Sequence, residues 1–246
     1  DNCTLKLDGL KNTKISIKQF FEEYPATLFF SDGCTIAGCI HTNYGDLPLS
    51  QIPVDRIETF DWAGVDFTIE SMYKSSVKRE HSIQEYMMQY LVNKGATIVF
   101  NDDNSGESAD IIAIFAKDNL IHFELIHCKY SKQDSGARLS DLYEVCGQAI
   151  VSLRYKWRPE ELLKHLERRN CTGVLQGKRF YHGNSGDIEK NKKALKYTDV
   201  SFEFAIAQPG VKASSITLDM HNFLGSVYST VVEMTETKLH CYFNQN

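Results

Sequence analysis

An acid, a histidine and a lysine are spaced along the chain in a way that suits metal-assisted chemistry. Asp110 immediately precedes the apolar run 111–115, and His127 and Lys129 lie near the end of the next apolar segment. Side chains alternate along a strand, so His127 and Lys129 share one face, whereas Glu124 lies on the other face unless a bulge intervenes. A lysine in an apolar strand needs a partner or a ligand. Metal-assisted phosphodiester cleavage needs carboxylate oxygens that hold Mg²⁺ or Mn²⁺ and a lysine that orients the attacking water.

The hydrophobic pattern predicts the elements that would carry these residues. Ser82 is a suitable helix N-cap, Glu85 three residues later completes a capping-box pattern, and Gly95 ends the helix. Apolar, β-branched runs separated by polar turns then predict strands, and an apolar stripe predicts a second helix. The expected order is a helix after Ser82, strands at 96–100, 109–115 and 120–130, a helix from Asp141 to about Tyr155, and a delayed strand at 200–207.

The rest of the chain has a weaker pattern. Residues 1–75 hold short apolar runs, turn signals at 31–33 and 44–46, and one expected helix at 17–23. We therefore expect an α/β protein in which a small strand-rich N-terminal region, residues 1–78, packs on a core of residues 79–246. An insertion at about 158–199 interrupts the core, and a helix within 214–232 leads into a short strand at 239–243.

The order helix, three strands, helix, strand, together with Asp110 and Lys129, resembles the PD-(D/E)XK nuclease superfamily over residues 82–156 and 200–207. The resemblance implies a restriction-endonuclease-like αβββαβ core with a mixed central sheet and a Mg²⁺- or Mn²⁺-dependent deoxyribonuclease activity. It implies that Asp110 binds the metal, that Lys129 is catalytic, and that Glu85 is the helix acid many members carry. His127 stands at the second acidic position of the motif, so either His127 or Glu124 would complete the metal site.

Flanking residues extend the resemblance. Gln148 lies on the helix after the lysine strand, where many such nucleases have a glutamine that contacts a phosphate or a metal-bound water. Glu107 is a second acid in the turn before Asp110. The residues expected to contact DNA are Ser131, Lys132 and Arg138 in the loop after the lysine strand, and Lys178 and Arg179 in a later Lys-containing polar stretch.

Several short segments are also similar to the C-terminal region of large bacterial helicase–nuclease proteins of DNA restriction and phage defence. They are residues 61–66 with 70–71, 105–110, 127–131, 143–149 and 208–210. This similarity implies a bacterial cytoplasmic protein that acts on DNA with a helicase or other ATPase module, in the same chain or a partner chain. Cleavage of both strands would need two sites, which a homo-oligomer would supply.

Each candidate residue also has an ordinary structural interpretation. Asp110 can be a turn acid that starts a strand, and Lys129 can extend to solvent from a strand end. His127 can be a core histidine whose ring is hydrogen-bonded within the protein or paired with a neighbouring carboxylate. Glu85 can be only a capping residue, and Gln148 can be an exposed helix residue. At the level of function, the alternatives are a catalytically inactive nucleic-acid-binding module of a helicase complex and a protein-interaction domain that docks on such a partner.

Charge and cysteine content limit the classes of protein to which the chain can belong. The net charge of -5 gives no global basic surface, so a nucleic acid would have to be held by a local patch. The seven cysteines are scattered and none forms a CxxC pair, so we expect neither zinc nor a disulfide framework. No apolar run approaches the roughly 18 residues of a membrane helix, which predicts no membrane association.

Overall fold

The computed structural model describes residues 4–6, 14–23, 27–30, 34–37, 40–42 and 51–245. The chain divides into two compact units, residues 1–52 with 218–226 and residues 53–217 with 227–246. The smaller unit contains an antiparallel pair, β1 (Thr4–Lys6) and β2 (Lys14–Ser16), the helix α1 (Ile17–Glu23), and an antiparallel sheet of β3 (Thr27–Phe29), β4 (Thr35–Ala37) and β5 (Ile40–Thr42). The predicted helix at 17–23 is confirmed, whereas the predicted turns at 31–33 and 44–46 lie outside the described residues.

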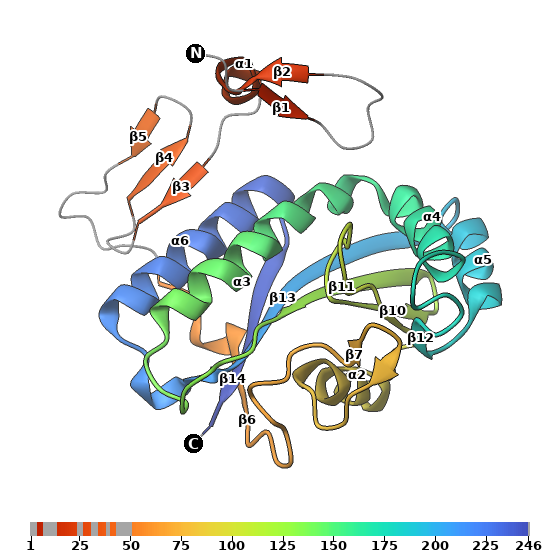
Figure 1. Ribbon diagram of the computed structural model, residues 1–246. Helices are drawn as coiled ribbons and strands as arrows, with labels where there is room; N and C mark the ends of the chain where they lie inside the picture. Colours follow the sequence, from red (N-terminus) through yellow and green to blue (C-terminus); the bar gives the residue numbers. More distant parts are fainter. Residues whose placement is uncertain are drawn as a thin grey trace. The chain divides into compact units, whose positions relative to one another are not determined.

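A seven-stranded mixed sheet forms the centre of the larger unit (Figure 1). Its strands, in spatial order, are β12 (Phe180–His182), β9 (Ile98–Asn101), β10 (Ile111–Lys117), β11 (Leu120–Cys128), β13 (Asp199–Lys212), β14 (Lys238–Asn244) and β6 (Ile57–Phe60). The pairs from β12 to β11 are antiparallel, and the pairs from β11 to β6 are parallel. The expected mixed α/β sheet is therefore present.

Helices cover both faces of this sheet. The α-helices of this unit are α2 (Ile83–Asn93), α3 (Leu139–Ser152), α4 (Pro159–Asn170) and α5 (Ser185–Ala194). The long α6 (Leu218–Thr235) is divided, with residues 218–226 in the smaller unit and the rest in the larger one. Short 3-10 turns are η1 (Val54–Arg56), η2 (Leu153–Trp157) and η3 (Ala213–Ser215), and β7 (Tyr73–Lys74) pairs with β8 (Val77–Lys78) as a hairpin. Helix α3 lies over β11 and β13, and α2 lies on the other side of the sheet (Figure 1).

Packing of α2 fixes the strand ends that matter for the site. Met87, Met88 and Leu91 are fully buried on α2 and belong to the same apolar cluster as Ile111 of β10 and Ile126 of β11. Ile111 and Ile126 are direct partners in the antiparallel ladder. The residues just before Ile111 and just after Ile126 therefore lie opposite each other on the face that α3 covers.

The predicted order of a helix, three strands, a second helix and a delayed strand is confirmed by α2, β9, β10, β11, α3 and β13. Ser82 caps α2 by accepting a hydrogen bond from the backbone N–H of Glu85, and Gly95 follows the helix with φ +99°. Strand β13 continues past residue 207 to Lys212, which differs from the prediction. A register shift against β14 after Gln208 accommodates the proline that was expected to end the strand.

The sequence analysis expects a boundary at residue 78, whereas residues 53–78 of the structure belong to the larger unit. Strand β6 pairs in parallel with β14 at the edge of the seven-stranded sheet. The expected insertion contains α4, β12 and α5, and β12 adds a strand to the other edge. Within the described residues, no helix has the length and apolar character needed to cross a membrane. Among the described cysteines, Cys128, Cys146 and Cys241 are buried free thiols and Cys171 is an exposed one.

Candidate metal centre and its supporting network

Asp110 occupies the position where the antiparallel pair β10–β11 opens. Its Oδ2 accepts a hydrogen bond of 2.8 Å from the backbone N–H of Cys128, across the ladder. Its Oδ1 accepts a hydrogen bond of 3.2 Å from the side-chain amide of Gln84, which is fully buried near the start of α2. Each carboxylate oxygen has two acceptor sites, so both retain one for a further ligand.

Two more acids approach Asp110 from the loop between β9 and β10. Carboxylate oxygens of Asp103, Glu107 and Asp110 all lie within 4.8 Å of one another. Burial and the charge of Asp103 raise the pKa of Glu107 to about 7, and burial together with Glu107 and Asp103 raises the pKa of Asp110 well above its ordinary value. Three partly desolvated carboxylates repel one another, and a bound divalent cation would relieve this repulsion.

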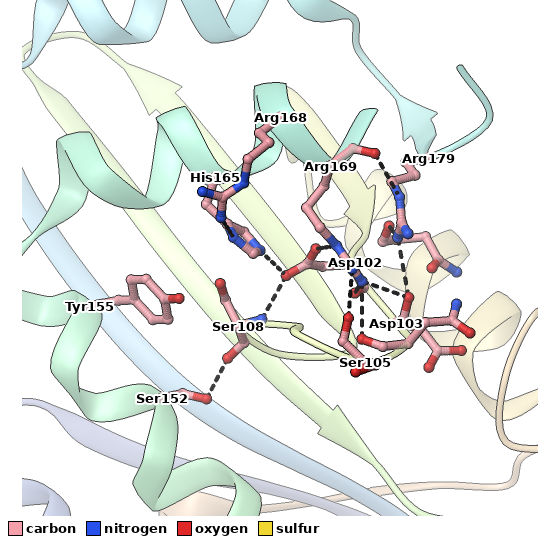
Figure 2. A network of polar contacts seen from close by, with 12 residues as sticks. Asp102, Asp103, Ser105, Ser108, Ser152, Tyr155, His165, Arg168, Arg169 and Arg179 are labelled. Carbon is pink, nitrogen blue, oxygen red and sulfur yellow. Dashed lines mark hydrogen bonds and ion pairs between the residues drawn. The ribbon is translucent and has the colours of Figure 1, made fainter. Parts of the chain in front are cut away.

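The loop that carries these acids is fixed by a buried ion-pair network (Figure 2). Asp102 accepts hydrogen bonds from the backbone N–H of Ser108 at 2.7 Å, from His165 Nε2 at 2.8 Å and from Arg169 Nε at 2.8 Å. The guanidinium of Arg169 also donates to the backbone carbonyls of Asp102, Asp103, Asn104 and Ser105. Helix α4 supplies both His165 and Arg169, so the inserted segment holds the acidic loop in place.

Arg179 belongs to this network, which corrects its predicted role as a DNA contact. Its side chain is buried and donates to the carbonyls of Asn101 and Asp103 at 3.0 and 3.2 Å and to that of Arg169 at 3.1 Å (Figure 2). A guanidinium with this many carbonyl partners stabilises a turn rather than a phosphate. The neighbouring Lys178 is exposed.

His127 lies beside Asp110, as the strand alternation predicts. Its Nδ1 is 3.7 Å from Asp110 Oδ2, and its Nε2 is 2.7 Å from the hydroxyl of Ser152 on α3. The other contacts of that hydroxyl are to the carbonyl oxygens of Ser108 and Gln148, which only accept, so Ser152 donates to a carbonyl and accepts from His127 Nε2–H.

This hydrogen-bond direction leaves a lone pair on the other nitrogen of the ring. Nδ1 of His127 is buried and has no hydrogen-bond partner among the residues that the structure describes. Burial lowers the pKa of His127 to about 3, so the ring is neutral at physiological pH. A neutral imidazole whose free nitrogen faces a carboxylate cluster is in the state that binds metal ions.

A cavity of about 300 Å³ opens at this point. Glu107, His127, Gln148 and Ser152 line it together with loop residues 104–106 and 108 and with Val151. The Oε1 of Gln148 is buried without a hydrogen-bond partner. The predicted proximity of Gln148 to the motif residues is therefore confirmed, and its amide faces the same cavity as His127 and Glu107.

Lys129 follows His127 on the strand but is already paired. Its ammonium contacts the exposed Glu144 of α3, lies 3.8 Å from Glu70 Oε2 and sits 4.7 Å from the centre of the Tyr130 ring. Burial disfavours the charged form, but the hydrogen bond to Glu144 and the charge of Glu70 raise the pKa of Lys129 above its ordinary value. Glu70 accepts a hydrogen bond of 3.0 Å from the backbone N–H of Tyr130, and burial raises its pKa.

Two predicted acids are not brought to the site. Glu124 is fully buried, but its carboxylate is held by Lys94 Nζ at 2.9 Å and by the hydroxyl of Tyr242 at 2.8 Å on the face that α2 covers. Glu85 forms an ion pair with Lys78. No bulge interrupts β11 between residues 120 and 128, so alternation keeps Glu124 away from His127. The expectation that Glu124 could complete the metal site is corrected on this ground, and the expected helix acid Glu85 is instead paired with Lys78.

The remaining predicted substrate contacts lie together around a second cavity of about 250 Å³, which Lys129, Tyr130, Ser131, Lys132, Arg138 and Glu144 help to line. Ser131 is buried, and its backbone N–H donates to the carbonyl of Phe67 at 2.8 Å. A β-carbon on Gly210 would lie 2.5 Å from Ser131 Cβ, so only glycine fits there. Lys132 is exposed at this cavity, whereas the guanidinium of Arg138 donates hydrogen bonds to the carbonyl of Asp134 and to the side chain of Gln133.

Sequence reasoning missed several residues of the site. Gln84 and Ser152 bind Asp110 and His127, and Asp103 completes the acidic group. Asp102, His165 and Arg169 were missed as well. Only Asp103 had a usable signal, because it follows the buried strand β9 in an acidic turn. No protein-family model, curated protein or solved structure matches the chain.

Proposed function

We propose that this chain is a metal-dependent nuclease that hydrolyses DNA phosphodiester bonds. The observation that carries the proposal is the meeting of the carboxylates of Asp103, Glu107 and Asp110 beside the unpartnered Nδ1 of buried, neutral His127. Asp110 lies across the β10–β11 ladder from His127, which is two residues before Lys129 along the chain. An acidic group, a neutral imidazole and an adjacent lysine are the components that metal-assisted phosphoryl chemistry uses.

The donor set fits a divalent cation. Asp103, Glu107 and Asp110 would supply oxygen ligands, which Mg²⁺ and Mn²⁺ prefer, and His127 Nδ1 would supply one nitrogen. The raised pKa of both Glu107 and Asp110 reflects unbalanced negative charge that such a cation would balance. A bound divalent cation would polarise a phosphate oxygen and lower the pKa of a bound water.

The chain's own residues would do the remaining work. Lys129, held near its position by Glu70 and Glu144, would face the phosphate as a positive charge. Gln148 would use its free amide in the 300 Å³ cavity to orient a phosphate oxygen or a water. Lys132 and Arg138, beside Lys129, would contact neighbouring phosphates of the DNA.

The biological setting is part of the proposal. The similarity of the short motifs to helicase-linked nuclease regions supports a role in bacterial DNA restriction or phage defence. A helicase or other ATPase module, in the same chain or a partner chain, would then supply the DNA. This setting follows from the motifs alone, whereas the chemistry is supported by the geometry of the metal centre.

The direct test is cleavage of supercoiled and linear DNA by the full chain with Mg²⁺ or Mn²⁺ and with EDTA. Asp110→Asn should abolish cleavage while leaving the circular-dichroism spectrum unchanged. The matched control is Asp118→Asn on the turn of the same hairpin, where φ is +53° and asparagine is well tolerated. Metal-dependent cleavage by wild type and Asp118→Asn, and none by Asp110→Asn, is the expected result. Full activity of Asp110→Asn would overturn the proposal.

A second candidate function is a nucleic-acid-binding module without catalysis. Two observations favour it: a histidine stands where the motif has an acid, and the ammonium of Lys129 is already paired with Glu144. DNA binding that persists in EDTA, with no cleavage under any divalent metal, would establish this function. Glu144→Gln separates the two candidates, because it releases the ammonium of Lys129. DNA cleavage should then increase if the chain is an enzyme, and no cleavage should appear if it is a binding module.

A further inference from the structure

The segment between α3 and β13 has a charge opposite to that of the whole chain. Residues 153–198 contain twelve Lys and Arg against five Asp and Glu, a net charge of +7, whereas the chain as a whole has -5. Part of this charge is paired internally. Arg169 and Arg179 hold the acidic loop, Arg158 pairs with Glu161, Lys164 with Glu160, and Lys192 with Glu167 and Glu189. Among the described residues, Lys190, Lys193 and Lys196 have no carboxylate within ion-pair distance. All three are exposed, Lys190 and Lys193 on α5 and Lys196 just after it.

Aromatic side chains are exposed within the same segment. Trp157 is 65% exposed and Tyr197 is 81% exposed, which is unusual for such large rings. Residues 154–158 alternate basic and aromatic side chains, Arg-Tyr-Lys-Trp-Arg, on the η2 turn and the residue after it. The ammonium of Lys156 lies 5.5 Å from the centre of the Trp157 ring, so the indole is flanked by positive charge.

These features meet at a groove of about 480 Å³ that is lined by residues of η2, the start of α4 and the end of α5. Trp157, Arg158, Lys164, Lys192 and Lys196 line it, with Pro159, Glu160, Glu161 and Leu195. Helices α4 and α5 pack against each other, which makes this a preformed surface. The groove shares no lining residue with the cavity at the candidate metal centre.

We infer that this groove binds single-stranded nucleic acid, with a base stacked on Trp157 and phosphates held by Lys196 in the groove and by the exposed Lys190 and Lys193 of α5. The chain as a whole is acidic but this segment is positively charged, which favours the binding of a polyanion. An exposed indole adds a stacking surface that an unpaired base can use, whereas the bases of a duplex are covered by their neighbours. Trp157 lies only five residues after Ser152, the last residue of α3. A nucleic-acid strand stacked on Trp157 would therefore be bound close to the helix that lines the candidate site. The inference does not depend on cleavage.

The test is fluorescence anisotropy with the full chain in EDTA, using labelled oligothymidylate and oligouridylate of about 16 nucleotides and a duplex of the same length. Both single strands should bind more tightly than the duplex, and their ratio shows whether DNA or RNA is the preferred strand. Trp157→Ala should weaken single-strand binding at least about fivefold, and Trp157→Phe should restore most of it. Equal affinity for the duplex, or wild-type binding by Trp157→Ala, would overturn the inference.

Charge reversal provides an independent measurement. Lys193→Glu and Lys196→Glu should each weaken binding and reduce the slope of log affinity against log salt by about 0.7 per lost phosphate contact. Lys74→Glu, an exposed lysine on the β7–β8 hairpin, is the matched control and should leave affinity and slope unchanged. An equal effect of all three substitutions would show only a general charge effect and would contradict a defined groove. Binding is measured in EDTA and cleavage in Mg²⁺ or Mn²⁺, so failure of this inference is distinguishable from failure of the proposed nuclease activity.

Discussion

Ser152 determines which nitrogen of His127 faces Asp110. The serine hydroxyl lies 2.7 Å from His127 Nε2 and is bound to carbonyl oxygens on its other side, so it accepts the imidazole proton. The lone pair of Nδ1 is then directed toward Asp110 Oδ2, 3.7 Å away. A helix residue thus sets the ligand state of a strand residue, which is the usual role of a group that hydrogen-bonds a metal-binding histidine.

Ser152→Ala should therefore weaken metal binding without touching a proposed ligand. Loss of the acceptor for Nε2–H frees the ring to change tautomer, and we expect Mn²⁺ affinity to fall about 10- to 100-fold. Two buried polar groups lose their partner, so the free energy of unfolding should fall by about 1–3 kcal/mol. Titration followed by Mn²⁺ electron paramagnetic resonance and urea unfolding measure the two effects. Ser140→Ala on the same helix is the control, and a Ser152→Ala affinity equal to that of Ser140→Ala would contradict the assignment.

The acidic cluster predicts a stability that falls with rising pH in metal-free protein. Burial and Asp103 raise the pKa of Glu107 from 4.5 to about 7, and the pKa of Asp110 is raised in the same direction. The folded state therefore binds more protons than the unfolded state between about pH 4.5 and 7, and the free energy of unfolding decreases as pH rises through this window. Urea unfolding across this range should show a smaller decrease for Glu107→Gln than for wild type.

Two comparisons test this pH effect further. Glu80→Gln changes an exposed acid and should follow the wild-type curve. Saturating Mn²⁺ should remove most of the decrease, because the cation stabilises the ionised carboxylates and stabilises the folded state by mass action. A Glu107→Gln curve parallel to wild type would mean that Glu107 does not titrate as its surroundings indicate.

Arg169 is expected to be the most important support of the acidic loop. Arg169→Ala removes hydrogen bonds to four backbone carbonyls and leaves buried Asp102 with less compensation for its charge. Loss of one partner of a buried pair costs about 3–5 kcal/mol, and the loop should no longer hold Asp103 and Glu107 beside Asp110. Chemical unfolding and Mn²⁺ titration should both show the loss. Lys178→Ala, at an exposed position outside this network, should change stability by less than about 1 kcal/mol.

Strand positions of the site could be predicted from the sequence because alternation has a period of two. This rule placed His127 and Lys129 on one face and Glu124 on the other, and the unbroken ladder of β11 leaves the carboxylate of Glu124 with Lys94 and Tyr242. The hydrophobic pattern also predicted the order of elements from α2 to β13. Local periodicity was sufficient for both results.

The missed residues depend on contacts between distant segments. A capping-box pattern identifies the start of α2 but not which side chain of its first turn points at the sheet, so Glu85 was chosen although the neighbouring Gln84 binds Asp110. Asp103 joins Asp110 because Arg169 and Arg179, more than 60 positions later, hold its loop. No local pattern reports such a long-range constraint.

Glu124 provides the sharpest test of where the metal centre lies, because the sequence left it as an alternative ligand. Glu124→Gln should lower the free energy of unfolding by about 1–3 kcal/mol, since a buried carboxylate bound to Lys94 and Tyr242 is lost. Tyr242→Phe should destabilise the protein through the same contact. Neither change should alter Mn²⁺ affinity, whereas Asp110→Asn should reduce it at least about tenfold. If Glu124→Gln weakens Mn²⁺ binding as strongly as Asp110→Asn, the cation is held on the α2 face of the sheet, and the group around Asp103, Glu107 and His127 is not the metal centre.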